Sequence, residues 1–236
     1  PWGVSAVLFT LIAAFAAVIV GTSLATVILP DANARFVMGY LVAAALTVIF
    51  VMVTRGRTPQ ERDALAYDKR TRTPLILVFM LAIGVAILLD LIGLPIAGVF
   101  LPTPELFGFY DITQNPVAAV PLNVLDWVLA LILLVIAQPI AEELVFRGVT
   151  YPALNKALGA WSGYVFTSVF YAVFHLVAYA PQGGTSGALF WYTLVLPFLE
   201  SLFLTGVRAN TRSTRAAIAA HAGLGLFALL RAFVIA

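Results

Sequence analysis

The chain has 236 residues, of which 62% are hydrophobic and 10% are charged, and its formal net charge is +2. A soluble domain carries roughly 25% charged residues, so this composition excludes an ordinary soluble protein and indicates an integral membrane protein. The small net charge argues against nucleic-acid binding. The chain has no cysteine, which excludes disulfides, thiolate metal sites and cysteine nucleophiles.

Apolar stretches of about 18 or more residues predict membrane-spanning helices. Such stretches recur along the whole chain, so we predict an all-α, polytopic helical bundle of about seven transmembrane helices. The fourth is longer than a bilayer requires, and we expect it to tilt, to kink at Pro139 or to project into water. The predicted spans are Val4–Leu29, Phe36–Thr54, Leu75–Phe100, Leu125–Leu154, Ser162–Ala180, Gly187–Val207 and Thr214–Ile235.

Basic residues gather in alternate loops. Segment 55–74 holds six of the thirteen Lys and Arg residues, and we expect it to be a solvated hairpin that sets the topology. Five more lie at the end of the fourth span (Arg147 and Lys156) and between the sixth and seventh spans (Arg208, Arg212 and Arg215). The positive-inside rule then places the amino terminus in the cytoplasm, and we expect a bacterial cytoplasmic membrane protein. Segment 101–123 is expected to be an extramembrane loop.

Charged side chains inside the spans are few. Each costs about 2.5–3.5 kcal/mol near the bilayer centre, so each needs a partner or a water-filled cavity. The charged residues inside the spans are Asp90 in the third, Glu142, Glu143 and Arg147 in the fourth, and Glu200 in the sixth. Both histidines of the chain, His175 and His221, also lie in spans. We interpret Glu200 as a helix-packing or cavity-lining residue.

The two adjacent glutamates divide into different roles. Glu143 and Arg147 are one helical turn apart and can form an ion pair. Glu142 is rotated by about 100° and has no cation one turn later, so it is the candidate general base. His175 lies one turn after Tyr171.

Three separate spans can therefore contribute to one cavity, in which Glu142, His175 and His221 activate a water and donate a hydrogen bond to an oxyanion. The same three residues could ligate zinc. Membrane histidines also serve as plain interhelical hydrogen-bonding groups. The residues alone leave these interpretations open.

Three motifs carry a family resemblance. Glu142-Glu143-x-x-x-Arg147 resembles the EExxxR motif of the CAAX prenyl protease and bacteriocin-processing family (CPBP, Abi) of intramembrane proteases. Tyr171-x-x-x-His175 is similar to its FxxxH motif, with tyrosine for phenylalanine. His221-x-x-x-Gly225 is similar to its third motif, in which asparagine or aspartate follows the histidine. The chain then divides into N-terminal helices and loops (1–124) and a CAAX-protease-like four-helix core (125–236).

The resemblance implies an endopeptidase that acts on a peptide or membrane-associated protein and uses no cofactor. Glu142 would activate the water, His175 would hold it, and His221 would stabilise the oxyanion. Glu143, Arg147 and Tyr171 would support the site. The implied partners are the lipid bilayer and a peptide or membrane-protein substrate, with no nucleic acid.

Gly225 is the main departure from the family pattern, because it offers no side-chain donor. Loss of one oxyanion donor typically costs about 10²–10³ in rate, and the hydroxyl of Tyr171 is a candidate replacement. One alternative is a catalytically silent member that acts as a membrane subunit or scaffold with partner membrane subunits. A transporter with Asp90 and Glu200 on a proton path is a weaker alternative, because no repeat is evident.

Overall fold

The computed structural model describes residues 1–29, 35–67, 69, 71–97, 110–111, 118–119, 123–179 and 186–235. Nearly all of these residues are helical. The first part of the chain forms α1 (Val4–Ile28), α2 (Arg35–Arg55), α3 (Pro59–Leu65), α4 (Leu75–Ala97) and a two-residue antiparallel ladder of β1 (Tyr110–Asp111) and β2 (Ala118–Ala119). The second part forms α5 (Val124–Ile132), α6 (Gln138–Glu143), α7 (Tyr151–Leu158), α8 (Ala160–Ala178), α9 (Ser186–Phe190), α10 (Leu196–Thr211) and α11 (Thr214–Ile235), with π-helical turns η2 (Leu133–Ala137), η3 (Leu144–Thr150) and η4 (Trp191–Val195).

The seven predicted spans are confirmed. Within the described residues, seven helical segments are long and apolar enough to cross a membrane, at Val4–Ile28, Arg35–Arg55, Leu75–Ala97, Val124–Leu158, Ala160–Ala178, Ser186–Thr211 and Thr214–Val234. Between 22% and 50% of the residues in their most apolar windows are buried inside the protein, so most apolar side chains are available to lipid. The predicted loop 101–123 lies outside the described residues except for β1, β2 and Asn123.

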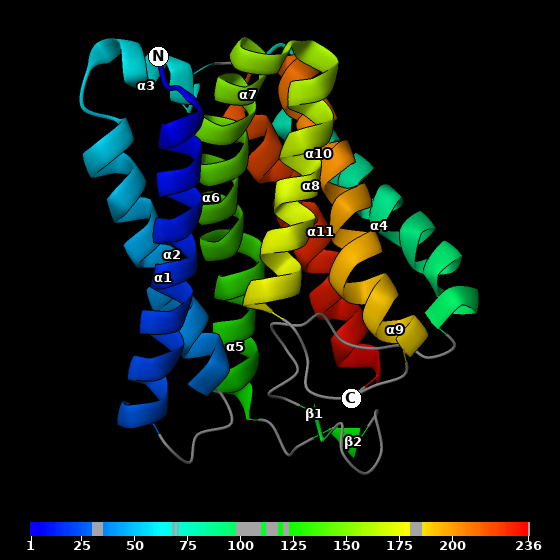
Figure 1. Cartoon of the computed structure of the whole chain (residues 1–236). Coiled ribbons are helices and arrows are strands. Elements are labelled where there is room, and N and C mark those ends of the chain that lie inside the picture. Colours follow the sequence, from blue (N-terminus) through cyan, green and yellow to red (C-terminus); the bar gives the residue numbers. More distant parts are fainter. Residues whose placement is uncertain are drawn as a thin grey trace.

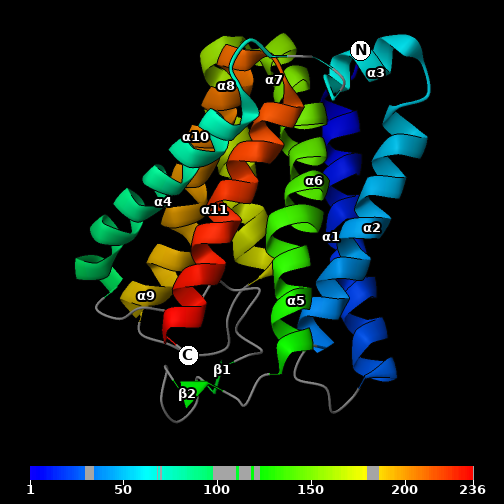
Figure 2. The same cartoon turned by 180° about the vertical axis from the view of Figure 1, so that it is seen from behind.

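The continuous segment from α5 to α7 stands at the centre of the bundle (Figure 1). The antiparallel pair α1 and α2 packs on one side of it, and α4, α8, α10 and α11 lie on the other. Seen from behind, α4 crosses α11 obliquely (Figure 2). The amino terminus, α3 and α7 lie at one end of the bundle, and the end of α11 lies at the other (Figure 1).

The basic segment 55–74 is more ordered than a solvated hairpin. Thr58 and Glu61 form a capping box at the start of α3. In this capping box the Thr58 N–H donates to the Glu61 carboxylate, and this hydrogen bond holds the pKa of Glu61 below its usual range. Leu65 is buried in the core, and its carbonyl accepts a hydrogen bond from the Thr214 hydroxyl at 2.6 Å. The prediction missed this contact between α3 and the start of α11, because contacts between residues so far apart in the chain leave no local sequence pattern.

Glycines allow the closest helix contacts. A Cβ on Gly223 of α11 would lie 2.4 Å from the Phe79 carbonyl oxygen of α4, which is far inside contact distance. Small residues at such positions let membrane helices approach closely, which strengthens their packing.

We expect Gly223→Ala to destabilise the α4–α11 contact, because the added methyl group meets backbone that cannot move aside. Overpacking of this kind costs about 1–3 kcal/mol. The matched control is Gly84→Ala on α4, where an added Cβ meets nothing within 4 Å. Thermal unfolding in detergent should show a lower melting temperature for Gly223→Ala alone. Equal melting temperatures for the two variants would contradict the close approach.

Candidate functional site

The fourth span is an irregular helix around the two glutamates. Pro139 has no N–H, and the N–H of Gln138 donates to the Leu133 carbonyl five residues back, which makes η2 a π turn. A second π turn, η3, follows Glu143. The predicted disturbance at Pro139 therefore takes the form of a π turn, and α6 presents both glutamates between two such turns. The span covers 35 residues, or about 52 Å at helical rise, so it exceeds a hydrocarbon core of about 30 Å.

Glu143 is the centre of an ionic cluster. The predicted ion pair is present, with Arg147 Nη1 donating to Glu143 Oε1 at 3.0 Å, and neither side chain is exposed. The same oxygen lies 2.9 Å from Nδ1 of His221 on α11. Arg147 Nη2 donates to the hydroxyl of Ser201 on α10 at 2.7 Å and to its carbonyl at 3.1 Å. One buried carboxylate and its arginine thus connect three spans.

Glu142 has a separate set of partners. Its Oε1 accepts hydrogen bonds from Gln138 Nε2 at 2.9 Å and from the Tyr179 hydroxyl at 3.0 Å. Its Oε2 accepts no hydrogen bond of normal geometry among the described residues, although the Tyr171 hydroxyl interacts with the carboxylate. Oε2 lies 3.6 Å from Nε2 of His175. That distance is too long for a direct hydrogen bond. The adjacent glutamates therefore face different histidines on different helices.

The hydrogen bonds fix which nitrogen of each histidine carries a proton. Nδ1 of His175 lies 3.1 Å from the Tyr171 carbonyl, which only accepts, so Nδ1 must donate and Nε2 is an acceptor in the neutral ring. Nδ1 of His221 donates to the Glu143 carboxylate by the same reasoning. His221 can then donate from Nε2 only as the imidazolium.

Two cavities meet near Glu142. One cavity is lined by Tyr171, His175, His221 and Gly225, and also by Glu200, as expected for a cavity-lining residue. On the other side a narrow apolar groove between α1, α2 and α6 reaches Glu142 and Tyr179. Gln138 lines both. The Glu142–His175 pair therefore lies in the wall between the two cavities.

Gly225 is closed to any side chain. A Cβ at this position would lie 2.0 Å from the carbonyl oxygen of Leu134 in η2. An asparagine could not be accommodated here without displacement of the π turn. Residue 225 therefore supplies no side-chain donor and leaves no room for one.

Asp90 lies apart from this site. Its carboxylate is 3.1 Å from Nε of Arg231, which links α4 to α11. Among the described residues, no group of three or more His, Asp or Glu side chains could hold a metal ion. The carboxylates and histidines instead form two pairs, Glu142 with His175 and Glu143 with His221.

Sequence reasoning missed three partners of the site. Gln138 lies one turn before Glu142, and Tyr179 one turn after His175, so helical spacing alone could have indicated both. Ser201 carried no such signal, because its contact with Arg147 joins residues 54 positions apart.

Comparison with known families adds one finding. Residues 123–227 match the model of the Rce1-like type II CAAX prenyl endopeptidase family, which is 105 of the 236 residues. This match confirms the family resemblance that the three motifs indicated over the same part of the chain, and the family is one of membrane endopeptidases. No curated protein and no solved structure matched the chain.

The Glu143–Arg147 pair predicts a large stability effect. Arg147→Met removes the guanidinium partner of the buried Glu143 carboxylate and leaves it only the His221 hydrogen bond. Breaking a buried pair typically costs about 3–5 kcal/mol. The double variant Glu143→Gln/Arg147→Met should lose less than the sum of the two single variants, because it leaves neither charge unpaired.

Unfolding in detergent with increasing denaturant measures these free energies. Lys69→Met is the matched control, because Lys69 and Asp63 form an exposed pair at 3.2 Å. Removing an exposed pair should change stability by about 1 kcal/mol or less. Additive losses in the double variant would show that the two side chains do not act as a pair.

Proposed function

We propose that this chain, whose core matches the type II CAAX prenyl endopeptidase family, is an intramembrane endopeptidase that hydrolyses a peptide bond in a membrane-associated substrate. The observation that carries the proposal is the Glu142–His175 pair. Glu142 Oε1 is occupied by two donors, whereas Oε2 accepts no hydrogen bond of normal geometry among the described residues and faces His175 Nε2 at 3.6 Å. A water beside these two atoms can lie about 2.8 Å from both.

This arrangement would orient the water as a nucleophile. Glu142 Oε2 and His175 Nε2 are both acceptors, so the water would donate one hydrogen to each. Its lone pairs would then point away from the pair and toward a substrate carbonyl. Such orientation removes much of the entropic cost of attack.

The hydrolysis would proceed in two steps. As the water oxygen bonds to the carbonyl carbon, Glu142 takes a proton from the water and the carbonyl π electrons move to the oxygen, which becomes the oxyanion. When the intermediate collapses, the C–N bond breaks and Glu142 returns that proton to the leaving nitrogen. His221 in its imidazolium form would stabilise the oxyanion, and Glu143 would stabilise that imidazolium.

The apolar groove supports a membrane-associated substrate. Its walls are mostly apolar side chains of α1, α2, α6, η3 and α8, and Glu142 is part of them. An apolar chain would bury well against these walls, and its attached peptide would lie beside the carboxylate. The chemistry needs no metal, and we propose that none takes part. The zinc alternative would make Glu142, His175 and His221 ligands.

We expect Glu142→Gln to abolish cleavage, since the amide cannot accept a proton from water. General-base catalysis contributes about 10²–10⁴ in rate. The readout compares new carboxyl termini among membrane proteins of cells that make the wild type or the variant, and cleavage of a farnesylated CAAX peptide by each purified protein. The control is Asp63→Asn on exposed α3, which should cleave normally, and a chelator should leave wild-type cleavage unchanged.

Other outcomes of the Glu142→Gln experiment would contradict the proposal or change the role of the residues. Identical carboxyl termini with wild type and Glu142→Gln, and no peptide cleavage by either, would contradict the proposal. A catalytically silent scaffold would then be favoured. Cleavage that is lost in chelator and restored by zinc would instead make the three residues metal ligands.

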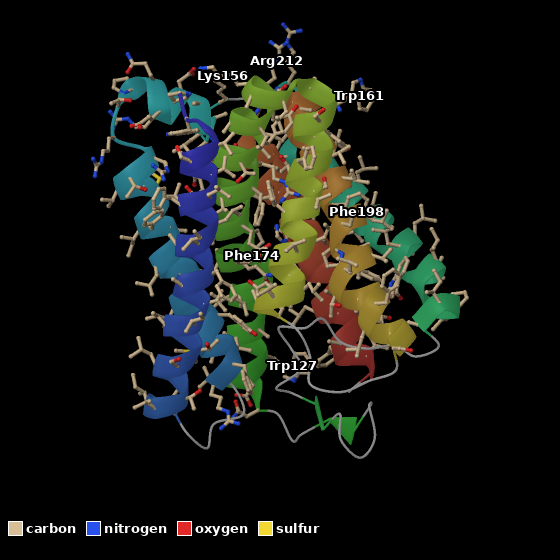
Figure 3. The ribbon with its side chains drawn as sticks, viewed as in Figure 1. Trp127, Lys156, Trp161, Phe174, Phe198 and Arg212 are labelled. Carbon is tan, nitrogen blue, oxygen red and sulfur yellow. The ribbon has the colours of Figure 1, made fainter. Side chains whose placement is uncertain are left out.

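We further propose that the amino terminus faces the cytoplasm of a bacterial cell. Lys156 and Arg212 lie at the same end of the bundle (Figure 3), which is also the end that carries α3 (Figure 1), a helix that contains Arg62. By the positive-inside rule this end is cytoplasmic.

Single cysteines can test this orientation, because the natural chain has none. A membrane-impermeant maleimide should label Val124→Cys, at the other end of the bundle, in intact cells. It should label Lys156→Cys only after the cells are opened. The cysteine-free wild type serves as the blank, and the reverse labelling pattern would show the opposite orientation.

A further inference from the structure

We infer that the hydroxyl of Tyr171 is a catalytic hydrogen-bond donor to the oxyanion, in place of the side chain that Gly225 lacks. The inference rests on the proposed peptidase function and deepens it. It assigns to this chain a donor that the phenylalanine of the FxxxH pattern could not supply.

The first step concerns what the cavity lacks. The Leu134 carbonyl blocks residue 225, because its oxygen lies only 2.0 Å from where a Cβ on Gly225 would stand, so no donor can come from that position. His221 donates Nδ1–H to Glu143, and its Nε2 becomes a donor only when the ring is protonated. A neutral, always-protonated donor is therefore missing at the point where the oxyanion would form.

The second step concerns where Tyr171 lies. Its ring stacks on His175 with 4.2 Å between centroids, and it meets the His221 ring edge-on at 6.4 Å. It lines the same cavity as both histidines and Gly225. In the resting site its hydroxyl interacts with the Glu142 carboxylate, and it would turn from there to the oxyanion once Glu142 has taken the proton from the water. The phenol is thus placed between the histidine that would hold the water and the histidine that would meet the oxyanion.

The third step concerns the strength of the donor. The guanidinium carbon of Arg147 lies 4.7 Å from the centre of the Tyr171 ring. A cation is attracted to the face of an aromatic ring, so this contact holds the Tyr171 ring in place. The residue is 1% exposed, so bulk water does not compete for its hydrogen bond. A fixed donor in a dry site is worth far more to an oxyanion than the same group in water.

The roles of the residues then separate. Tyr171 donates to the oxygen that gains negative charge as water attacks and releases that hydrogen bond when the carbonyl re-forms, so it undergoes no net proton transfer. The proton of the water passes to Glu142 and then to the leaving nitrogen. Arg147 positions the Tyr171 ring without contact with the substrate.

The test is Tyr171→Phe, which removes one oxygen atom and keeps the ring on His175 and under Arg147. With a farnesylated CAAX peptide as the probe, we expect kcat to fall about 10²- to 10³-fold while KM changes little. A phosphonate peptide that mimics the tetrahedral intermediate should lose affinity by a similar factor, whereas the cleaved peptide product should bind as before. Tyr192→Phe is the matched control, because Tyr192 lines the same cavity but bonds to Arg231 at 2.9 Å.

The outcomes of these measurements separate the role of Tyr171 from the peptidase function. Unchanged kcat in a folded Tyr171→Phe protein, or an equal loss in Tyr192→Phe, would overturn the assignment while leaving the peptidase function intact. An equal loss of product affinity and phosphonate affinity would show that Tyr171 only shapes the cavity. If the wild type does not cleave the peptide and does not bind the phosphonate, both the peptidase function and this role are wrong.

Discussion

The carboxylate of Glu143 holds together the helices from which the site is built. It accepts from Arg147 on its own helix and from His221 on α11, while Arg147 continues to Ser201 on α10. In a low-dielectric interior each of these charges would be costly alone, and each partner offsets part of the other's desolvation. Because Glu143 is committed to this cluster, the adjacent Glu142 is turned toward α8, where His175 and Tyr179 meet it.

Backbone irregularity gives the cluster its geometry. Two π turns enclose the six residues of α6, and Pro139 accounts for the first of them because it cannot donate to a regular helix. π turns often occur at functional sites because they re-aim the side chains that follow. The first turn also directs the Leu134 carbonyl at Gly225, so the same local feature that presents Glu142 closes residue 225 to a side chain.

The parts of the structure that could be predicted are those with a local signal. Hydropathy is continuous along each span, so all seven spans were predictable, and the Glu143–Arg147 pair followed from helical spacing. The contact of His221 with Glu143 was not predictable, because it depends on how α11 packs against α6 and no spacing rule reaches across 78 residues. Sequence identified Gly225 as a lost donor, but only the structure shows that Leu134 leaves no room for another side chain there.

The most direct measurement of the central claim is an experimental structure detailed enough to place waters in the wall between the two cavities. We expect one ordered water about 2.6–3.1 Å from both Glu142 Oε2 and His175 Nε2, with a lone-pair direction open to the cavity. A direct Glu142–His175 hydrogen bond with no room for a water would contradict the claim that this pair activates one.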